Sequence, residues 1–447
     1  MSRVIERFLG DREVVSEVFR ISTPIIVSQL GESVYSIADT FFVSKLGSIS
    51  LAAVGVGSYM NFLFYSVISM FSTGALVYVS QSIGAGRRDD ARLCIGELVI
   101  YSLPVALGLA ALAYYIAPLL ALKVSSNPSV AVLASKYFRI CMAGFPVMIT
   151  TWILDSSIRA TGYTKYSMIA ILSSISLNIA LDPILIYGLL GAPRLGVAGA
   201  ALATVASTAI IIPIETYYLS KLNLTPTFSR DTSRFRKSVV IGAPASAERM
   251  IFSVGTILYV SIISRCGAQA LAAYKVGVSV ESFIYMPGIA FMYAASALVG
   301  QKVGAGRIEE AKKMGWAVAR SSLALLGLLG VIAIVFSRYL VAPFSPSKQV
   351  LELASIYMII AGSCEPGLAL SLSIAGGVRG GGNTTIPLVI NALGYYIVRI
   401  IPAKILAGVY GVAGVWVAMA IDDYVRGAVF ALVYWRFFEK LARRVHS

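Results

Sequence analysis

The sequence has little charge and a single histidine. Charged residues make up 13% of its 447 residues, whereas hydrophobic residues make up 57%. A soluble protein carries about 25% charged residues, so this composition excludes an ordinary soluble domain and indicates an integral membrane protein. The only histidine is His446, one residue from the end, which excludes a catalytic centre or a metal site built from several histidines.

Cysteine is also scarce. The four cysteines, Cys94, Cys141, Cys266 and Cys364, are scattered and form no CxxC pair, so they indicate neither a disulfide framework nor a metal site. Residues 1–20 are charged and amphipathic and lack the apolar core of a cleavable signal peptide. With no histidine cluster, metal motif or nucleophile arrangement, an enzyme embedded in the membrane is disfavoured and no cofactor is expected.

Long apolar stretches dominate what remains. Twelve of them reach the roughly 20 residues that a helix needs to cross about 30 Å of hydrocarbon, so the sequence predicts an all-α integral membrane protein with twelve transmembrane helices. The formal net charge is +15, but the basic residues gather in alternate short loops. This pattern places both termini in the cytoplasm and argues against a nucleic-acid partner.

The chain repeats itself at an offset of 220 residues. Gln81–Arg92 reads QSIGAGRRDDAR and Gln301–Lys312 reads QKVGAGRIEEAK. Both GAGR segments fall on the same side of the membrane, which predicts two parallel repeats of six helices, as in many secondary transporters. We therefore expect an amino-terminal lobe over residues 1–222, a cytoplasmic connector over 223–237 and a carboxy-terminal lobe over 238–447.

The GAGR segments have two interpretations. Two glycines permit a tight turn, and the arginine is suited to the lipid headgroups. A phosphate-binding loop is the alternative, but it requires a strand before the loop, which the membrane context does not offer.

Acidic residues inside predicted spans are the main functional signal. The first half contains four of them: Glu32, Asp39, Asp155 and Asp182. Each costs on the order of 2.5–3.5 kcal/mol at mid-span, so each must face water, a cation, a proton or another charged group. Asn178 and Thr204 add oxygen atoms near Asp182, and oxygen clusters of this kind suit hard cations such as Na⁺.

Internal ion pairs are the alternative for these carboxylates. Asp155 has Arg159 four residues later, on the same helix face. For Asp39 and Asp182 the pairing is disfavoured, because the nearest basic candidate, Arg139, is expected near the outer end of its span. Glu32 lies seven residues before Asp39 and so shares its face, where we expect it to line an aqueous cavity.

Three further features point to a moving, ligand-binding helix bundle. Pro24 interrupts the first span, either as a fixed kink or as a bend that changes between states. Glu281 in the second half is either a second coupling or substrate residue or the partner of Lys275 or Arg249. Most aromatic residues are expected to be ordinary core or lipid-facing packing, and a subset, Tyr35 and Tyr137 among them, to line a cavity for flat or amphiphilic cations.

The chain resembles the multidrug and toxic compound extrusion (MATE) family, in particular its archaeal and DinF-like branch. The resemblance is carried by the following segments: PIIVSQLGESVYSIADTFFVSKLG (Pro24–Gly47), AAVGVG (Ala52–Gly57), GAGR in both halves, RATGYT (Arg159–Thr164) and LNIALDPILI (Leu177–Ile186). It implies two six-helix lobes and antiport of organic cations and other xenobiotics against Na⁺ or H⁺.

The resemblance also implies roles for individual residues. Asp39 resembles the carboxylate that takes the coupling ion, with Asp182, Asn178 and Thr204 as the rest of a possible Na⁺ site. Tyr137 is expected on the cavity wall beside them, and Pro24 resembles a proline about which bending is proposed. Glu32 and Asp155 stand where uncharged amides are expected.

Together these observations predict a multi-pass antiporter of the plasma membrane that works by alternating access. Its expected partners are the lipid bilayer and a small cationic or amphiphilic substrate, and the chain is expected to act as a monomer. The first rival is a flippase for a lipid-linked saccharide or another lipid, whose cavity should be basic. A channel is the other rival, although the two dissimilar lobes favour alternating access.

Overall fold

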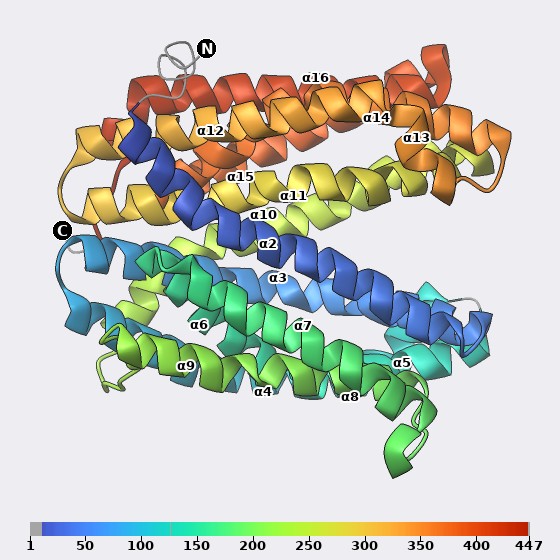
Figure 1. The fold of residues 1–447 in the computed structure, drawn as a ribbon, viewed down its shortest axis with the longest axis horizontal. Coiled ribbons are helices and arrows are strands. Elements are labelled where there is room, and N and C mark those ends of the chain that lie inside the picture. Colours follow the sequence, from blue (N-terminus) through green and yellow to red (C-terminus); the bar gives the residue numbers. More distant parts are fainter. Residues whose placement is uncertain (1–10, 126, 446–447) are drawn as a thin grey trace. The chain divides into compact units, whose positions relative to one another are not determined.

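The computed structural model describes residues 11–125 and 127–445, so His446 lies outside the described residues. Figure 1 follows the chain from α2 in blue to α16 in red. The described residues form helices and no strand. The helices of the first repeat are α2 (Arg12–Ser44), α3 (Ser48–Gly84), α4 (Arg88–Val124), α5 (Pro128–Ala143), α6 (Phe145–Thr161), α7 (Thr164–Tyr187), the short η1 (Leu189–Gly191), α8 (Val197–Ala209) and α9 (Ile211–Lys221).

The second repeat follows after the connector. Its helices are α10 (Ser233–Arg265), α11 (Ala268–Gly304), α12 (Ile308–Val335), α13 (Ser337–Val341), the short η2 (Ala342–Phe344), α14 (Lys348–Gly380), α15 (Thr385–Leu393), the π-helical η3 (Gly394–Ile400) and α16 (Ile401–Leu441).

Local sequence explains where several helices begin and end. The side chain of Asn127 accepts a hydrogen bond from the backbone N–H of Ser129 at 2.9 Å and caps α5. Gly162 and Gly188 take the left-handed conformation that closes α6 and α7. In the GAGR segments Gly86 and Gly306 have φ of 73° and 78°, so the interpretation as tight turns is confirmed.

Nine helices in the described part of the chain are long and apolar enough to cross a membrane, or ten if α5 and α6, bent by 51°, form one broken span. The predicted twelve are reached when two further segments are counted. One is α2, whose charged residues lower its hydropathy. The other comes from dividing the span Thr385–Leu441 at Gly411, where φ is 60° and ψ is −147°.

The chain forms two compact units. One contains residues 27–83 and 87–246, and the other contains residues 11–26, 84–86 and 247–445. We call them the amino-terminal and carboxy-terminal units. The divisions fall two residues after Pro24 in α2 and two residues after Pro244 in α10. The predicted lobes are instead divided at the connector. The lobes and the units therefore differ in where the first part of α2 and the first part of α10 belong.

Within the amino-terminal unit, the start of α10 packs directly on α3. A Cβ atom on Gly242 would lie 1.7 Å from the carbonyl oxygen of Met70, so only glycine permits this approach. Beside it, Glu97 of α4 accepts hydrogen bonds from Arg234 Nη1 and from the backbone N–H of Phe235, both at 3.1 Å. These contacts hold the end of the connector against the first repeat.

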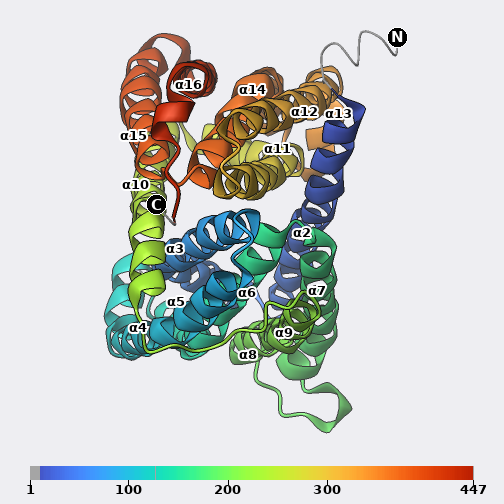
Figure 2. The same ribbon diagram turned by 90° about the vertical axis from the view of Figure 1, so that its left-hand side faces the viewer.

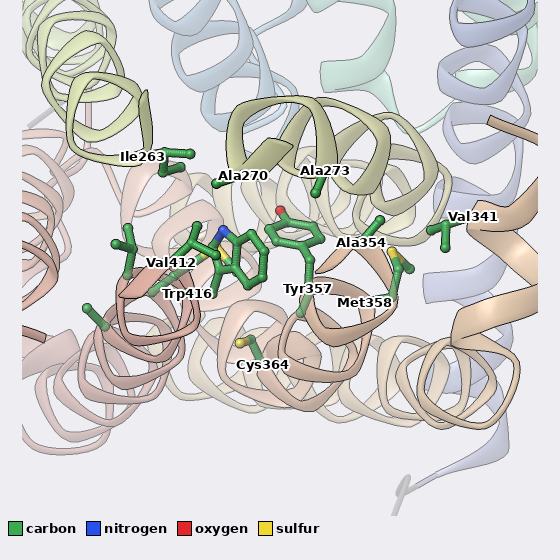
Figure 3. Packing of buried hydrophobic residues seen from close by; sticks show 14 of the residues in the cluster. Ile263, Ala270, Ala273, Val341, Ala354, Tyr357, Met358, Cys364, Val412 and Trp416 are labelled. Carbon is green, nitrogen blue, oxygen red and sulfur yellow. The ribbon is translucent and has the colours of Figure 1, made fainter. Parts of the chain in front are cut away.

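Within the carboxy-terminal unit, α14 contacts α11, α12 and α16, and Figure 2 shows α11, α12 and α14 side by side. Figure 3 shows the core between them, where Tyr357 and Trp416 face each other. Their ring centroids are 5.2 Å apart and the planes are nearly perpendicular, at 83°. This edge-to-face packing is the arrangement that aromatic rings favour.

Candidate functional site

The residues predicted to bind a coupling ion come together in the amino-terminal unit. Asn178 and Asp182 lie one turn apart on α7, and both are buried. With its amide nitrogen facing Asp182, Asn178 donates to Asp182 Oδ2 at 3.0 Å, and its oxygen accepts from the backbone N–H of Thr204 at 3.3 Å. Asn178 therefore fixes the Asp182 carboxylate and joins α7 to α8.

Two residues of α2 complete this group. The hydroxyl oxygens of Tyr35 and Thr204 lie 3.1 Å apart and share a hydrogen bond. Asp39, one turn further along α2, is close enough to Asp182 for their charges to interact. One carboxylate oxygen of each, Oδ1, is buried and has no hydrogen-bond partner in the described residues.

Tyr137 of α5 lies beside this group. It is buried, and its ring packs so closely on α3 that a Cβ atom on Gly57 would lie 2.6 Å from its Cδ1 atom. The ring is within electrostatic range of Tyr35 and Asp39. Arg139 does not neutralise the carboxylates, because its Nε atom donates to the backbone oxygen of Tyr114 at 2.9 Å.

The chemistry of these atoms fits a hard monovalent cation or a proton. Asp39 Oδ1 and Asp182 Oδ1 are acceptors without a donor, and carboxylate and hydroxyl oxygens are ligands that hard cations prefer. The described residues contain no group of three or more His, Cys, Asp or Glu side chains placed to hold a metal ion. A Na⁺ ion would thus be held by carboxylate, hydroxyl and amide oxygens together.

Asp155 and Glu32 are not part of the group around Asp39 and Asp182. Asp155 Oδ2 is 2.7 Å from Arg159 Nε, and the Ser167 hydroxyl donates to Asp155 Oδ1. The ion pair considered from the sequence is therefore present. Glu32 is within electrostatic range of Arg159 and Asp155. Although Glu32 and Asp39 share a face of α2, they have different neighbours.

Sequence reasoning missed Glu215 on α9. It is fully buried beside Asp155, and neither of its carboxylate oxygens has a hydrogen-bond partner in the described residues. Its position in an apolar span is the same signal that marked Asp39, so it was available in the sequence.

Glu281 of α11 has a hydroxyl partner. Tyr357 of α14 donates a hydrogen bond to the Glu281 carboxylate. In the described part of the chain this bond takes the place of the pairing with Lys275 or Arg249 considered from the sequence. The Glu281 side chain is half-buried, and among the described residues no salt bridge neutralises its carboxylate.

The same unit contains a buried charge network on η3 and α16. Arg399, in the π-helical η3, donates to Asp422 at 2.7 Å and to Asp423 at 2.9 Å, and Arg426 donates to both aspartates. Two positive and two negative groups therefore balance. The spacing of Arg426 from Asp422 and Asp423, four and three residues, predicts part of this network, whereas the contribution of Arg399 is not local.

Comparison with known proteins places this geometry in context. A family model described as MatE matches residues 24–184 and again residues 244–405, and the two starting points confirm the offset of 220. A probable multidrug resistance protein, NorM, from Thermotoga maritima is 26% identical over 439 residues, which cover 94% of this chain and 92% of the relative.

Two more proteins extend the comparison. A protein named FAD transporter from Shewanella oneidensis is 25% identical over 417 residues, covering 92% of each chain. The crystal structure of a mutant of VcmN, a MATE transporter from Vibrio cholerae, superposes with a TM-score of 0.90 at 18% identity and covers 97% of this chain and 98% of its own. The structural likeness confirms the predicted fold of twelve helices in two lobes.

Proposed function

Because the chain belongs to the MatE family and is a multi-pass membrane transporter of small molecules, we propose that it exports organic cations in exchange for Na⁺ or H⁺. Members of this family are transporters and not enzymes. The coupling ion is taken by Asp39 and Asp182, which Asn178, Thr204 and Tyr35 hold in place.

One observation supports this proposal above the others. Asp39 and Asp182 come from two helices, interact electrostatically, and each has a buried carboxylate oxygen without a donor in the described residues. Two neighbouring carboxylates in a membrane protein are costly unless a cation or a proton neutralises them. An ion that binds there offsets this cost, so its binding favours the arrangement of α2, α7 and α8 that holds it.

The cycle follows from this coupling. An ion entering from outside neutralises Asp39 and Asp182, α2, α7 and α8 repack, and the substrate is expelled. Pro24 is the proposed bending point of α2. One charge crossing about 100 mV provides about 2.3 kcal/mol, roughly a fifty-fold concentration ratio, which is enough to drive export.

A cationic or amphiphilic substrate fits the charge of the amino-terminal unit. Asp39 and Asp182 supply negative charge, and Tyr35 and Tyr137 add aromatic surface suited to flat cations. Glu32 adds a carboxylate elsewhere in the unit, whereas the charge of Asp155 is offset by Arg159. An anion such as FAD, named in one relative, or the pyrophosphate of a lipid-linked saccharide requires basic groups instead. The half-buried Glu281 is the proposed substrate contact of the carboxy-terminal unit.

We further propose that a single chain acts in the plasma membrane with both termini in the cytoplasm. The grouping of basic residues in alternate loops supports this orientation. Accessibility of single introduced cysteines to a membrane-impermeant reagent tests it: labelling near Arg87 from outside intact cells contradicts the orientation.

Transport in liposomes tests the function. The purified protein is reconstituted, and export of a fluorescent organic cation is measured under a Na⁺ gradient and, separately, under a pH gradient. Asp39→Asn is measured in parallel with the matched variant Glu97→Gln. Glu97 is a buried carboxylate of α4 that is not part of the group formed by Tyr35, Asp39, Asn178, Asp182 and Thr204, which we call the ion group.

We expect one of the two gradients to drive export, and we expect Asp39→Asn to lose driven export while remaining folded. Glu97→Gln keeps the response to the gradient. Normal export by Asp39→Asn contradicts the assignment. Transport of FAD or a lipid-linked saccharide, with no transport of cations under either gradient, contradicts the proposed substrate class.

A further inference from the structure

Glu215 is a buried acidic residue outside the ion group, and its carboxylate lacks hydrogen-bond donors in the described residues. Its side chain is 0% exposed, and neither carboxylate oxygen has a hydrogen-bond partner in the described residues. It lies within hydrogen-bonding reach of Asp155. Ionised carboxylates only accept hydrogen bonds, so this pair can form one only if one of the two carries a proton.

The charged and polar side chains around Glu215 do not supply the missing hydrogen-bond donor. Helices α6, α7 and α8 contact α9. Of these, α6 contributes Asp155 and Arg159, α7 contributes the Ser167 hydroxyl while its Lys165 is exposed, and α8 has no charged residue. Arg159 Nε lies 2.7 Å from Asp155 Oδ2 and the Ser167 hydroxyl donates to Asp155 Oδ1, whereas neither Glu215 oxygen receives a hydrogen bond from the described residues.

Glu32 of α2 adds a further negative charge near Arg159. It is a third carboxylate within electrostatic range of Arg159 and Asp155. If all three acids are ionised, one guanidinium faces three negative charges. A buried surplus of charge is strongly unfavourable, and a bound proton or cation removes it.

The second repeat shows the same arginine without the surplus. Arg379 is the counterpart of Arg159 at the offset of 220, and its Nη2 atom donates to both oxygens of Glu248, at 2.7 and 2.9 Å. The counterparts of Glu32 and Asp155 at this offset are Phe252 and Ala375. In the last helix of each repeat the shared motif GVAG (residues 196–199 and 411–414) sets the offset to 215, so the counterpart of Glu215 is Phe430. One cation thus meets one anion there, and the surplus is specific to the first repeat.

We propose that Glu215 and Asp155 share a bound proton and form a proton site separate from Asp39 and Asp182. A proton is favoured over a metal cation because Arg159 Nε, 2.7 Å from Asp155 Oδ2, repels a metal ion at this place. A proton supplies the missing donor and removes one negative charge.

The two sites lie at different depths of the unit. Ser167 and Asp182 are fifteen residues apart on α7, which corresponds to about 22 Å at 1.5 Å per residue. The proton site lies near the helix ends that carry Lys165 and Lys221, which are predicted to be cytoplasmic. Its use in transport rests on the proposed antiport: the proton exchanges with the cytoplasm, so internal pH affects export independently of the ion at Asp39.

Infrared difference spectroscopy on the full-length protein in lipid tests the site directly. The carbonyl band of a protonated carboxyl group is compared between the parent protein and Glu215→Gln at neutral pH. Glutamine brings its own N–H donor to Asp155 and needs no proton. The matched control is Glu97→Gln, because Glu97 is also 0% exposed but accepts from Arg234 and from the Phe235 N–H at 3.1 Å.

We expect Glu215→Gln to lose a protonated-carboxyl band that Glu97→Gln keeps. Asp155→Asn, which also brings a donor, should lose the same band and serves if Glu215→Gln does not fold. An unchanged band in both variants overturns the proposal, as does a site that binds Na⁺ and loses this binding in Glu215→Gln. Asp39→Asn should keep the band, so this result stands or falls separately from the coupling role of Asp39.

Discussion

The hydroxyl oxygens of Tyr35 on α2 and Thr204 on α8 lie 3.1 Å apart and share a hydrogen bond. This bond joins the helix that carries Asp39 to a helix that contacts Asp182 through Asn178. Removing either hydroxyl should therefore weaken binding of the coupling ion at Asp39 and Asp182, although neither Tyr35 nor Thr204 is charged.

Tyr35→Phe removes this bond and keeps the ring. A hydrogen bond contributes about 0.5–1.5 kcal/mol, so we expect the coupling-ion concentration for half-maximal export to rise by about two- to tenfold. The measurement is a titration of the ion in the liposome assay. Tyr410→Phe, at a side chain that is 68% exposed, should leave the value unchanged, and an equal shift in both variants contradicts the role of Tyr35.

The charge network around Arg399 predicts a stability effect. Arg399→Met leaves Asp422 and Asp423 buried with Arg426 as their remaining arginine, and removing one partner of a buried ion pair costs about 3–5 kcal/mol. We expect a clear drop in the thermal unfolding temperature in detergent. The exposed Arg338 provides the control, because Arg338→Met should unfold at the parent temperature. An unfolding temperature of Arg399→Met close to that of the parent protein contradicts this prediction and means that water reaches the charge network.

The contact between α10 and α3 predicts a steric effect. Gly242→Ala places a methyl group where 1.7 Å separates it from the Met70 carbonyl oxygen, and overpacking of this kind costs about 1–3 kcal/mol or more. The thermal unfolding temperature should fall. Gly108 in α4 has nothing within 4 Å of an added Cβ, so Gly108→Ala should be neutral or slightly stabilising; equal behaviour of the two variants contradicts the close approach.

Much of the fold could be predicted from the sequence because its signals are local or repeated. Apolar length predicts the spans, and the repeated GAGR segments predict two copies of one unit. Asp39 and Asp182 could be singled out as candidate ion ligands because they are acids inside apolar spans, and the structure brings them close together. The alternatives for Asp155 and Glu281 could not be resolved from spacing alone, because Ser167 and Tyr357 contact them from other helices.

Other features depend on contacts between distant parts of the chain. Glu215 and Asp155 are sixty residues apart, so no spacing rule joins them. Arg399 reaches Asp422 from the π-helical η3, whose backbone turn differs from the α-helical spacing that pattern reasoning assumes. The assignment of the first part of α2 to the carboxy-terminal unit likewise depends on packing, of Val18 and Ile21 on Phe291 and its neighbours.

Ion movement that depends on the substrate is the most direct test of ion coupling at Asp39 and Asp182. Liposomes containing the parent protein, Asp39→Asn or Asp182→Asn are loaded with an organic cation, and uptake of Na⁺ and of protons is recorded with and without the cation. We predict that the cation stimulates uptake of one ion by the parent protein and that both variants lose this stimulation. Ion uptake that needs no cation, or that persists unchanged in both variants, contradicts the account.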